Sequence, residues 1–177
     1  RMDHISISSM GSDVADIDGD GDLDVFSTDM LPADNYRLKA NTVFNSYSSD
    51  NIRYRADYHY QILQNCLQLN DGKADFTEVA NYAGVAATDW SWGALIFDFD
   101  NDRKQDIFVA NGIYQDIMFM DFTDFIADKE EVKKIVMEKG TFDWRDFAAY
   151  LPSTPLANYA FVQKEDLRFE NQADQLG

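Results

Sequence analysis

Residues 15–29, ADIDGDGDLDVFSTD, decide the fold, because they place six aspartates and two glycines in one short segment. Carboxylates this close repel one another by several kcal/mol at an intermediate dielectric, so the segment needs a cation or protons to neutralise it. The residues after the aspartates alternate in the manner of a strand. We therefore predict a cation-binding loop that joins two strands, and call residues 16–24 the first acidic loop.

The same pattern recurs in DFDNDRKQD, residues 98–106, which we call the second acidic loop. The two loops align without gaps and share the spacing D-x-D-x-D-x-x-x-D. A second repeat relates residues 65–84 to 158–177, since Asn65, Phe76 and Gly84 recur 93 residues later as Asn158, Phe169 and Gly177. Turn residues in the middle of each copy predict strand, turn and strand.

Four hairpins in this order predict an all-β fold with helical insertions, in which four-stranded antiparallel units act as β-propeller blades. The chain would hold a partial propeller of two to three blades. The expected divisions are a first partial blade with an acidic loop at 1–31, an insertion at 32–60, a complete blade with the second loop at 61–115, a helical insertion at 116–151, and the start of the next blade at 152–177.

The helical pattern is clearer in the second insertion than in the first. Residues 32–60 are polar and tyrosine-rich, and we expect some helix there. Residues 122–140, FTDFIADKEEVKKIVMEKG, place apolar side chains near helical spacing and end in Gly140. DWRDFAAYLP then predicts a second short helix that Pro152 stops.

Calcium suits the acidic loops, because it is a hard ion that takes six to eight oxygen ligands at roughly 2.3–2.6 Å. Gly19 and Gly21 allow the positive φ angles that wrap the chain around an ion. Asp22 and Lys104, each two positions after the third aspartate of its loop, would contribute a backbone carbonyl. The expected ligands are Asp16, Asp18, Asp20, Asp22 and Asp24 in the first loop, and Asp98, Asp100, Asp102, Lys104 and Asp106 in the second.

An EF-hand is the competing interpretation of D-x-D-x-D-G. Its twelfth position needs a bidentate glutamate, whereas the two loops place Ser27 and Val109 there. An EF-hand also needs flanking helices, whereas these flanks have the pattern of strands. A nine-residue loop closed by an aspartate fits a β-hairpin better.

DIDGDGDLD resembles the D-x-D-G-D-G-x-x-D loops of the FG-GAP or VCBS repeat family at every defining position. The surrounding segments at 9–32, 88–112 and 158–171 are similar to large bacterial surface members with the ASPIC/UnbV-type arrangement. The resemblance implies an integrin-alpha-type propeller with calcium in its loops. The second loop departs from the family pattern, because Asn101 stands at its fourth position and Arg103 at its sixth, which is normally glycine. We therefore expect this loop to bind calcium more weakly.

Composition limits the partners. The net charge of −17 argues against nucleic-acid backbones and anionic membrane surfaces, and favours metal cations. No stretch approaches the eighteen apolar residues of a membrane helix. The single cysteine, Cys66, lies beside leucines, which predicts a buried thiol. The chain begins at Arg1 rather than Met, which indicates a processed product or a piece of a longer protein, with the rest of a larger propeller as a partner.

These features favour an extracellular or outer cell-surface binding or adhesion module, secreted or surface-attached, with two mainly structural Ca²⁺ ions and a protein or glycan ligand. The alternative is a glycan-binding or glycan-degrading calcium propeller similar to polysaccharide lyases, with Trp90 and Trp92 stacking on the ligand. No triad, nucleophile elbow or phosphate-binding glycine loop nominates a catalytic residue, which favours a protein that is not an enzyme.

Overall fold

The computed structural model describes residues 1–42, 46–140 and 143–176, and it has a mixed α/β fold. The chain divides into two compact units. The first unit contains residues 1–33, 45–112 and 156–177, and holds every strand of the described chain. The second unit contains residues 34–44 and 113–155, and its described elements are helices.

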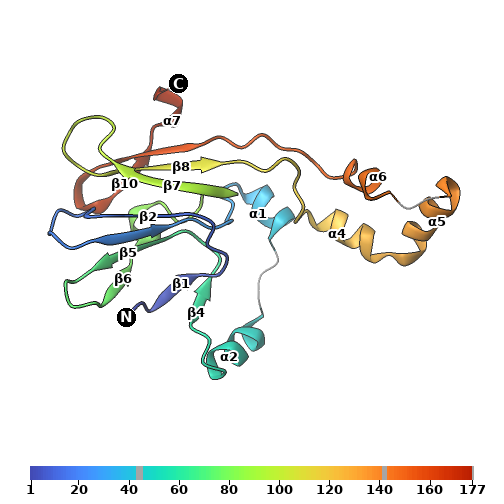
Figure 1. Ribbon diagram of the computed structural model, residues 1–177, viewed down its shortest axis with the longest axis horizontal. Coiled ribbons are helices and arrows are strands. Elements are labelled where there is room, and N and C mark those ends of the chain that lie inside the picture. The colour runs from blue at the N-terminus through green and yellow to red at the C-terminus, as the bar shows by residue number, and fades with distance from the viewer. Residues whose placement is uncertain (43–45, 141–142, 177) are drawn as a thin grey trace. The chain divides into compact units, whose positions relative to one another are not determined.

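Two four-stranded antiparallel sheets form most of the first unit (Figure 1). The first sheet consists of β2 (Ser12–Ala15), β3 (Asp24–Ser27), β5 (Cys66–Asn70) and β6 (Phe76–Glu78), in that order. The second sheet consists of β7 (Ser91–Phe97), β8 (Asp106–Asn111), β9 (Tyr159–Gln163) and β10 (Phe169–Asn171), in that order. A small parallel sheet pairs β1 (His4–Ser6) with β4 (Tyr60–Ile62).

The prediction of an all-β propeller is wrong. The described chain is mixed α/β, with three separate sheets of two, four and four strands, none of which closes into a ring. The hairpins also group differently from the expected blade at 61–115. β5 and β6 pair with the strands before them, and β7 and β8 pair with those after them. Repeated turn signals fix each hairpin, but they do not fix which hairpin is its neighbour or whether sheets close.

The hydrophobic core lies between the two four-stranded sheets. Phe26 and Leu67 from the first sheet and Ile107 and Val109 from the second have no exposed surface, and they belong to one buried cluster. Strand β2 lies beside β7 in Figure 1. The carboxylate of Asp13 accepts a hydrogen bond from the backbone N–H of Ile96 at 2.7 Å, which satisfies a donor on the edge of the second sheet.

Short helices complete the first unit. They are α2 (Tyr47–Arg55), α3 (Ala80–Ala83), the 3₁₀ turn η1 (Glu165–Leu167) and α7 (Ala173–Leu176). Helix α3 ends at Gly84, whose φ of 84° is the left-handed conformation that favours glycine at a helix end.

The helices of the second unit are α1 (Asn35–Asn41), α4 (Met120–Ala127), α5 (Lys129–Lys139) and α6 (Trp144–Ala148). The single helix expected over 122–140 is broken at Asp128, which ends α4 in an extended conformation and accepts the N–H of Glu130 at 3.0 Å. Aspartate competes with a continuing helix in this way because its side chain caps a new one. Gly140, with φ of 71°, follows α5 as expected.

A buried ion pair holds the second unit together. Arg37 on α1 donates through both terminal nitrogens to Asp116, at 2.9 and 3.1 Å, and Thr154 donates to the same carboxylate at 3.1 Å. This bidentate geometry compensates the cost of burying both charges. No helix in the described ranges combines the length and apolar character that crossing a membrane requires.

Asn65 directly precedes β5, is fully buried, and ties the segment after β3 to the segment before β7. Its Oδ1 accepts the N–H of Asp29 at 2.8 Å. Its Nδ2 donates to the carbonyl of Val85 at 2.9 Å and to Oγ1 of Thr88 at 2.6 Å. Asn158, its partner in the repeat, accepts the N–H of Asn111 in the same manner at 2.9 Å.

We expect Asn65→Ala to lower the free energy of unfolding by about 3 kcal/mol, because it leaves the buried N–H of Asp29 and carbonyl of Val85 without partners. Urea denaturation measures the loss. Asn81→Ala, at an exposed asparagine with one side-chain hydrogen bond, is the matched control and should cost less than about 1 kcal/mol. Equal losses in the two variants would contradict the role assigned to Asn65.

Cys66 is buried, as its sequence context predicts. Burial, together with the negative charges of Glu78 and Asp29, raises the pKa of its thiol to about 12. We expect the thiol to react with an aromatic disulfide reagent at pH 8 only at the rate at which the protein unfolds. Rapid labelling of the folded protein, monitored by absorbance, would show that this part of the first sheet opens.

Candidate metal centres

Each acidic loop links the first two strands of one four-stranded sheet. Asp16 directly follows β2 and Asp24 begins β3, while Asp98 and Asp106 hold the same places relative to β7 and β8. The flanking elements are therefore strands, as the sequence predicts, which excludes an EF-hand. The strand ends bring the first and last aspartates of a loop together.

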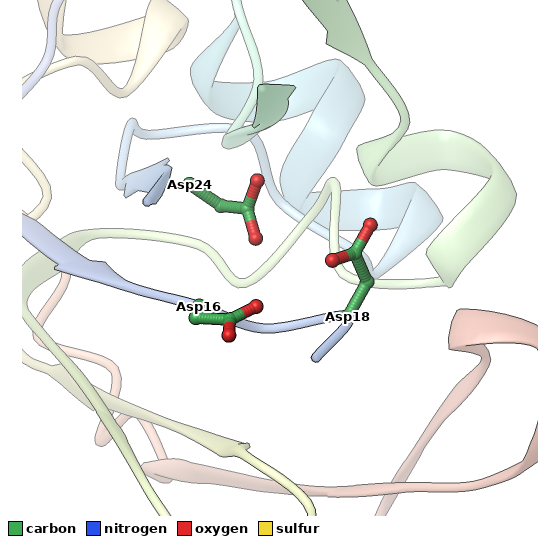
Figure 2. A group of neighbouring side chains, drawn as sticks. All are labelled: Asp16, Asp18 and Asp24. Atoms are coloured by element: carbon green, nitrogen blue, oxygen red, sulfur yellow. The ribbon is translucent and has the colours of Figure 1, made fainter. Parts of the chain in front are cut away.

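Three carboxylates converge in each loop. Asp16, Asp18 and Asp24 each place an oxygen within 4.8 Å of the others, and Figure 2 shows the three side chains around a common space. Asp98, Asp100 and Asp106 form the same arrangement in the second loop. One cation can touch three oxygens at this spacing, since two oxygens that are each about 2.4 Å from an ion are at most about 4.8 Å apart. Both triads could thus hold a metal ion.

Backbone N–H groups orient the first aspartate of each loop. The carboxylate of Asp16 accepts the N–H groups of Gly19 at 2.8 Å, Asp20 at 3.0 Å and Gly21 at 3.1 Å. Asp98 accepts those of Asp102 at 3.1 Å and Arg103 at 3.0 Å. These donors offset part of the negative charge, and the aspartate spacing alone did not indicate them.

The last aspartate of each loop is fully buried and fixes the loop to its sheet. Asp24 accepts the N–H of Ile17 in its own loop and the N–H of Asn70 at the end of β5, both at 2.8 Å. Asp106 accepts the N–H of Phe99 at 3.2 Å and the N–H of Gln163 on β9 at 2.9 Å. Each oxygen retains a second lone pair for an ion.

The other expected ligands lie outside the two triads. Asp20 and Asp102 are exposed, and their carboxylates accept the N–H groups of Asp22 and Lys104, each at 2.8 Å. These bonds shape the turns that carry the two residues expected to offer backbone carbonyls.

The two loops have the same backbone despite their different residues. Gly19 and Gly21 have φ angles of 77° and 98°, and Asn101 and Arg103 in the second loop have φ angles of 62° and 76°. Arg103 therefore has a positive φ, as Gly21 does at the same place in the first loop. A Cβ added at Gly19 or Gly21 would meet no atom within 4 Å, so a side chain at these places costs only backbone strain.

The pKa of one aspartate is raised in each loop, at Asp18 in the first and at Asp106 in the second. Desolvation, followed by the carboxylates of Asp24, Asp20 and Asp16, raises the pKa of Asp18 against an opposing hydrogen bond from the N–H of Asp20. Desolvation likewise raises the pKa of Asp106 against its two backbone hydrogen bonds. Without an ion, each loop thus holds a carboxylate whose charged form is disfavoured.

Gln163 connects the two loops. Its N–H donates to Asp106 of the second loop, and its Nε2 donates to the carbonyl of Ile17 in the first loop at 3.0 Å. The N–H of Ile17 in turn donates to Asp24. One chain of hydrogen bonds therefore runs from one buried carboxylate to the other. No sequence pattern indicates this connection, because glutamine is a common residue in strands.

The two tryptophans proposed for ligand stacking differ in exposure. Trp90 is 8% exposed and Trp92 is 55% exposed, with their ring centroids 6.3 Å apart. The Nε1 of Trp92 donates to the carbonyl of Gly112, which holds the ring against the end of β8. Of these two rings, only that of Trp92 is exposed enough to contact a ligand.

Family models, curated proteins and solved structures contain no match to this chain. The chemistry of the loops therefore follows from their own residues. All the side-chain donors in the two triads are carboxylate oxygens. Such a set suits a hard divalent cation and offers no group that would prefer a soft metal.

We expect Asp24→Ala to destabilise the chain in the presence of a chelator by about 3 kcal/mol, because it leaves two backbone N–H groups unpaired. Asp18→Ala removes an exposed carboxylate that is repelled by its neighbours, and should be neutral or slightly stabilising under the same conditions. Urea denaturation of both variants in chelator measures the difference. A large loss from Asp18→Ala would show that this carboxylate supports the empty loop.

Proposed function

We propose that the chain binds one Ca²⁺ at each acidic loop, and that it serves as an extracellular or cell-surface binding module in which these ions are mainly structural. The observation that carries the proposal is the convergence of three carboxylates within 4.8 Å at both loops. Two unit charges about 4 Å apart repel by about 1 kcal/mol in bulk water and about 4 kcal/mol near a protein surface. A divalent cation converts this repulsion into attraction.

Calcium fits the donors better than magnesium does. The loops offer carboxylates and backbone carbonyls from one short segment, and calcium accepts six to eight such oxygens in flexible geometry. Magnesium requires a near-ideal octahedron and keeps several of its waters. The resemblance of DIDGDGDLD to the calcium loops of the FG-GAP or VCBS family supports the same ion.

The position of the loops supports a structural role. Asp24 and Asp106 each tie a loop to the third strand of its sheet. An ion held by these carboxylates would therefore stabilise the loop, the hairpin and the next strand together, so that its binding free energy adds to folding. Millimolar extracellular calcium would fill even weak sites of this kind, which favours an exterior location.

Thermal unfolding in calcium, magnesium and chelator tests the proposal. We expect calcium at about a hundredfold above its Kd to raise the Tm by about 5–10 °C, and magnesium to raise it much less. Asp18→Ala should remove most of the shift and Asp100→Ala a smaller part, because Arg103 places a positive charge in the second loop.

Asp174→Ala, at an exposed aspartate outside both loops, is the control and should leave the calcium shift unchanged. An equal response to magnesium would refute the choice of ion. A calcium shift that survives both loop variants would refute the site.

A further inference from the structure

A pocket lined by tyrosines lies in the first unit, away from the acidic loops. Its volume is about 330 Å³, near the lower end of the roughly 300–1,000 Å³ typical of ligand pockets. Helix α2 forms one wall, and the first residue of β1 together with β4 forms the other. The lining residues include His4, Tyr47, Asp50, Asn51, Tyr54 and Tyr60.

One face of α2 supplies most of the wall. Positions 47, 50, 51 and 54 follow the i, i+3, i+4, i+7 spacing that places side chains on one side of a helix. This face alternates aromatic rings with side chains that hydrogen-bond. No residue of α2 is buried, and Tyr47 and Tyr54 are 85% and 53% exposed. Packing in a core therefore does not explain these tyrosines.

The opposite wall holds the rings in place. Tyr54 stacks on Tyr60 with centroids 4.5 Å apart, and Tyr60 packs against His4 at 5.4 Å. His4 and Tyr60 are partners in the β1–β4 register, and the carbonyl of His4 accepts Nε2 of Gln68 at 2.6 Å. Tyr54 thus belongs to a stack of three rings, in which Tyr60 lies between it and His4. A ligand that binds to Tyr54 therefore causes only a small further loss of side-chain entropy in this ring.

The charges in this pocket are balanced, although the chain carries a net charge of −17. Asp50 lies 3.8 Å from Arg53, which also lines the pocket, so one negative charge faces one positive charge. A strongly charged ligand has no complementary surface here. A neutral ligand with many hydroxyl groups does, because Asp50 and Asn51 can each hydrogen-bond through two side-chain atoms.

We propose that this pocket binds a neutral oligosaccharide, with a sugar ring on the free face of Tyr54 and hydroxyl groups at Asp50 and Asn51. A pyranose ring presents a face of C–H bonds whose small positive charge is attracted to the negative face of an aromatic ring. The hydroxyl groups at its edge match the polar side chains that lie between the tyrosines. Tyr47 extends the same surface by a further aromatic ring.

Isothermal titration of the whole chain tests this site with a panel of neutral hexasaccharides built from glucose, N-acetylglucosamine, mannose, galactose and xylose. We expect at least one to bind, and Tyr54→Ala to weaken it about tenfold. Tyr54→Trp keeps a flat ring and should retain binding. Tyr58→Ala, at a 61% exposed tyrosine of the same segment that does not line the pocket, should bind as the natural chain does.

Each titration is run in calcium and in chelator, since none of the pocket residues belongs to an acidic loop. Binding that depends on Tyr54 in both conditions supports the proposal whatever the loops bind. Failure of the whole panel would overturn it, as would binding that Tyr54→Ala leaves unchanged. A decaproline peptide that binds through Tyr54 where no sugar does would assign the pocket to an extended peptide instead.

Discussion

A buried carboxylate at the end of each acidic loop is the constraint on which the first unit depends. Asp24 and Asp106 have no exposed surface, and each oxygen accepts a backbone N–H. One of those donors belongs to the loop and the other to the third strand of the sheet. A single side chain therefore sets both where the loop closes and where the next hairpin docks, which explains how a short, highly charged loop is compatible with a defined sheet.

The two four-stranded sheets show that a loop closed by a buried aspartate tolerates different residues at its turns. Arg103 and Asn101 adopt the left-handed backbone that glycines adopt in the first loop. The hydrogen bond from the N–H of Arg103 to Asp98 contributes to holding this conformation. Away from the loops, Asn65 holds the start of β5 and Asn158 holds the start of β9. The hydrogen bonds that define the repeat thus come from a few buried polar side chains, and the turn residues vary around them.

Sequence patterns predicted the local structure better than its assembly. The spacing of the aspartates identified both loops, strand-like alternation identified the hairpins, and the leucines around Cys66 indicated its burial. The prediction of a propeller is wrong, because turn signals do not specify which hairpins become neighbours. The break at Asp128 was missed because apolar spacing continues through it, and the pocket at α2 was missed because residues 32–60 show no clear period.

Gln163 gives the two loops a route by which each can affect the other. Its backbone touches the buried carboxylate of one loop and its side chain touches the backbone of the other. An ion that draws Asp106 into a fixed position also restricts Gln163, so part of the ordering needed at the first loop has already occurred. By linkage, any such gain is reciprocal and equal in both directions. If both loops bind the same cation, this coupling would make the pair fill over a narrower range of ion concentration than two isolated loops.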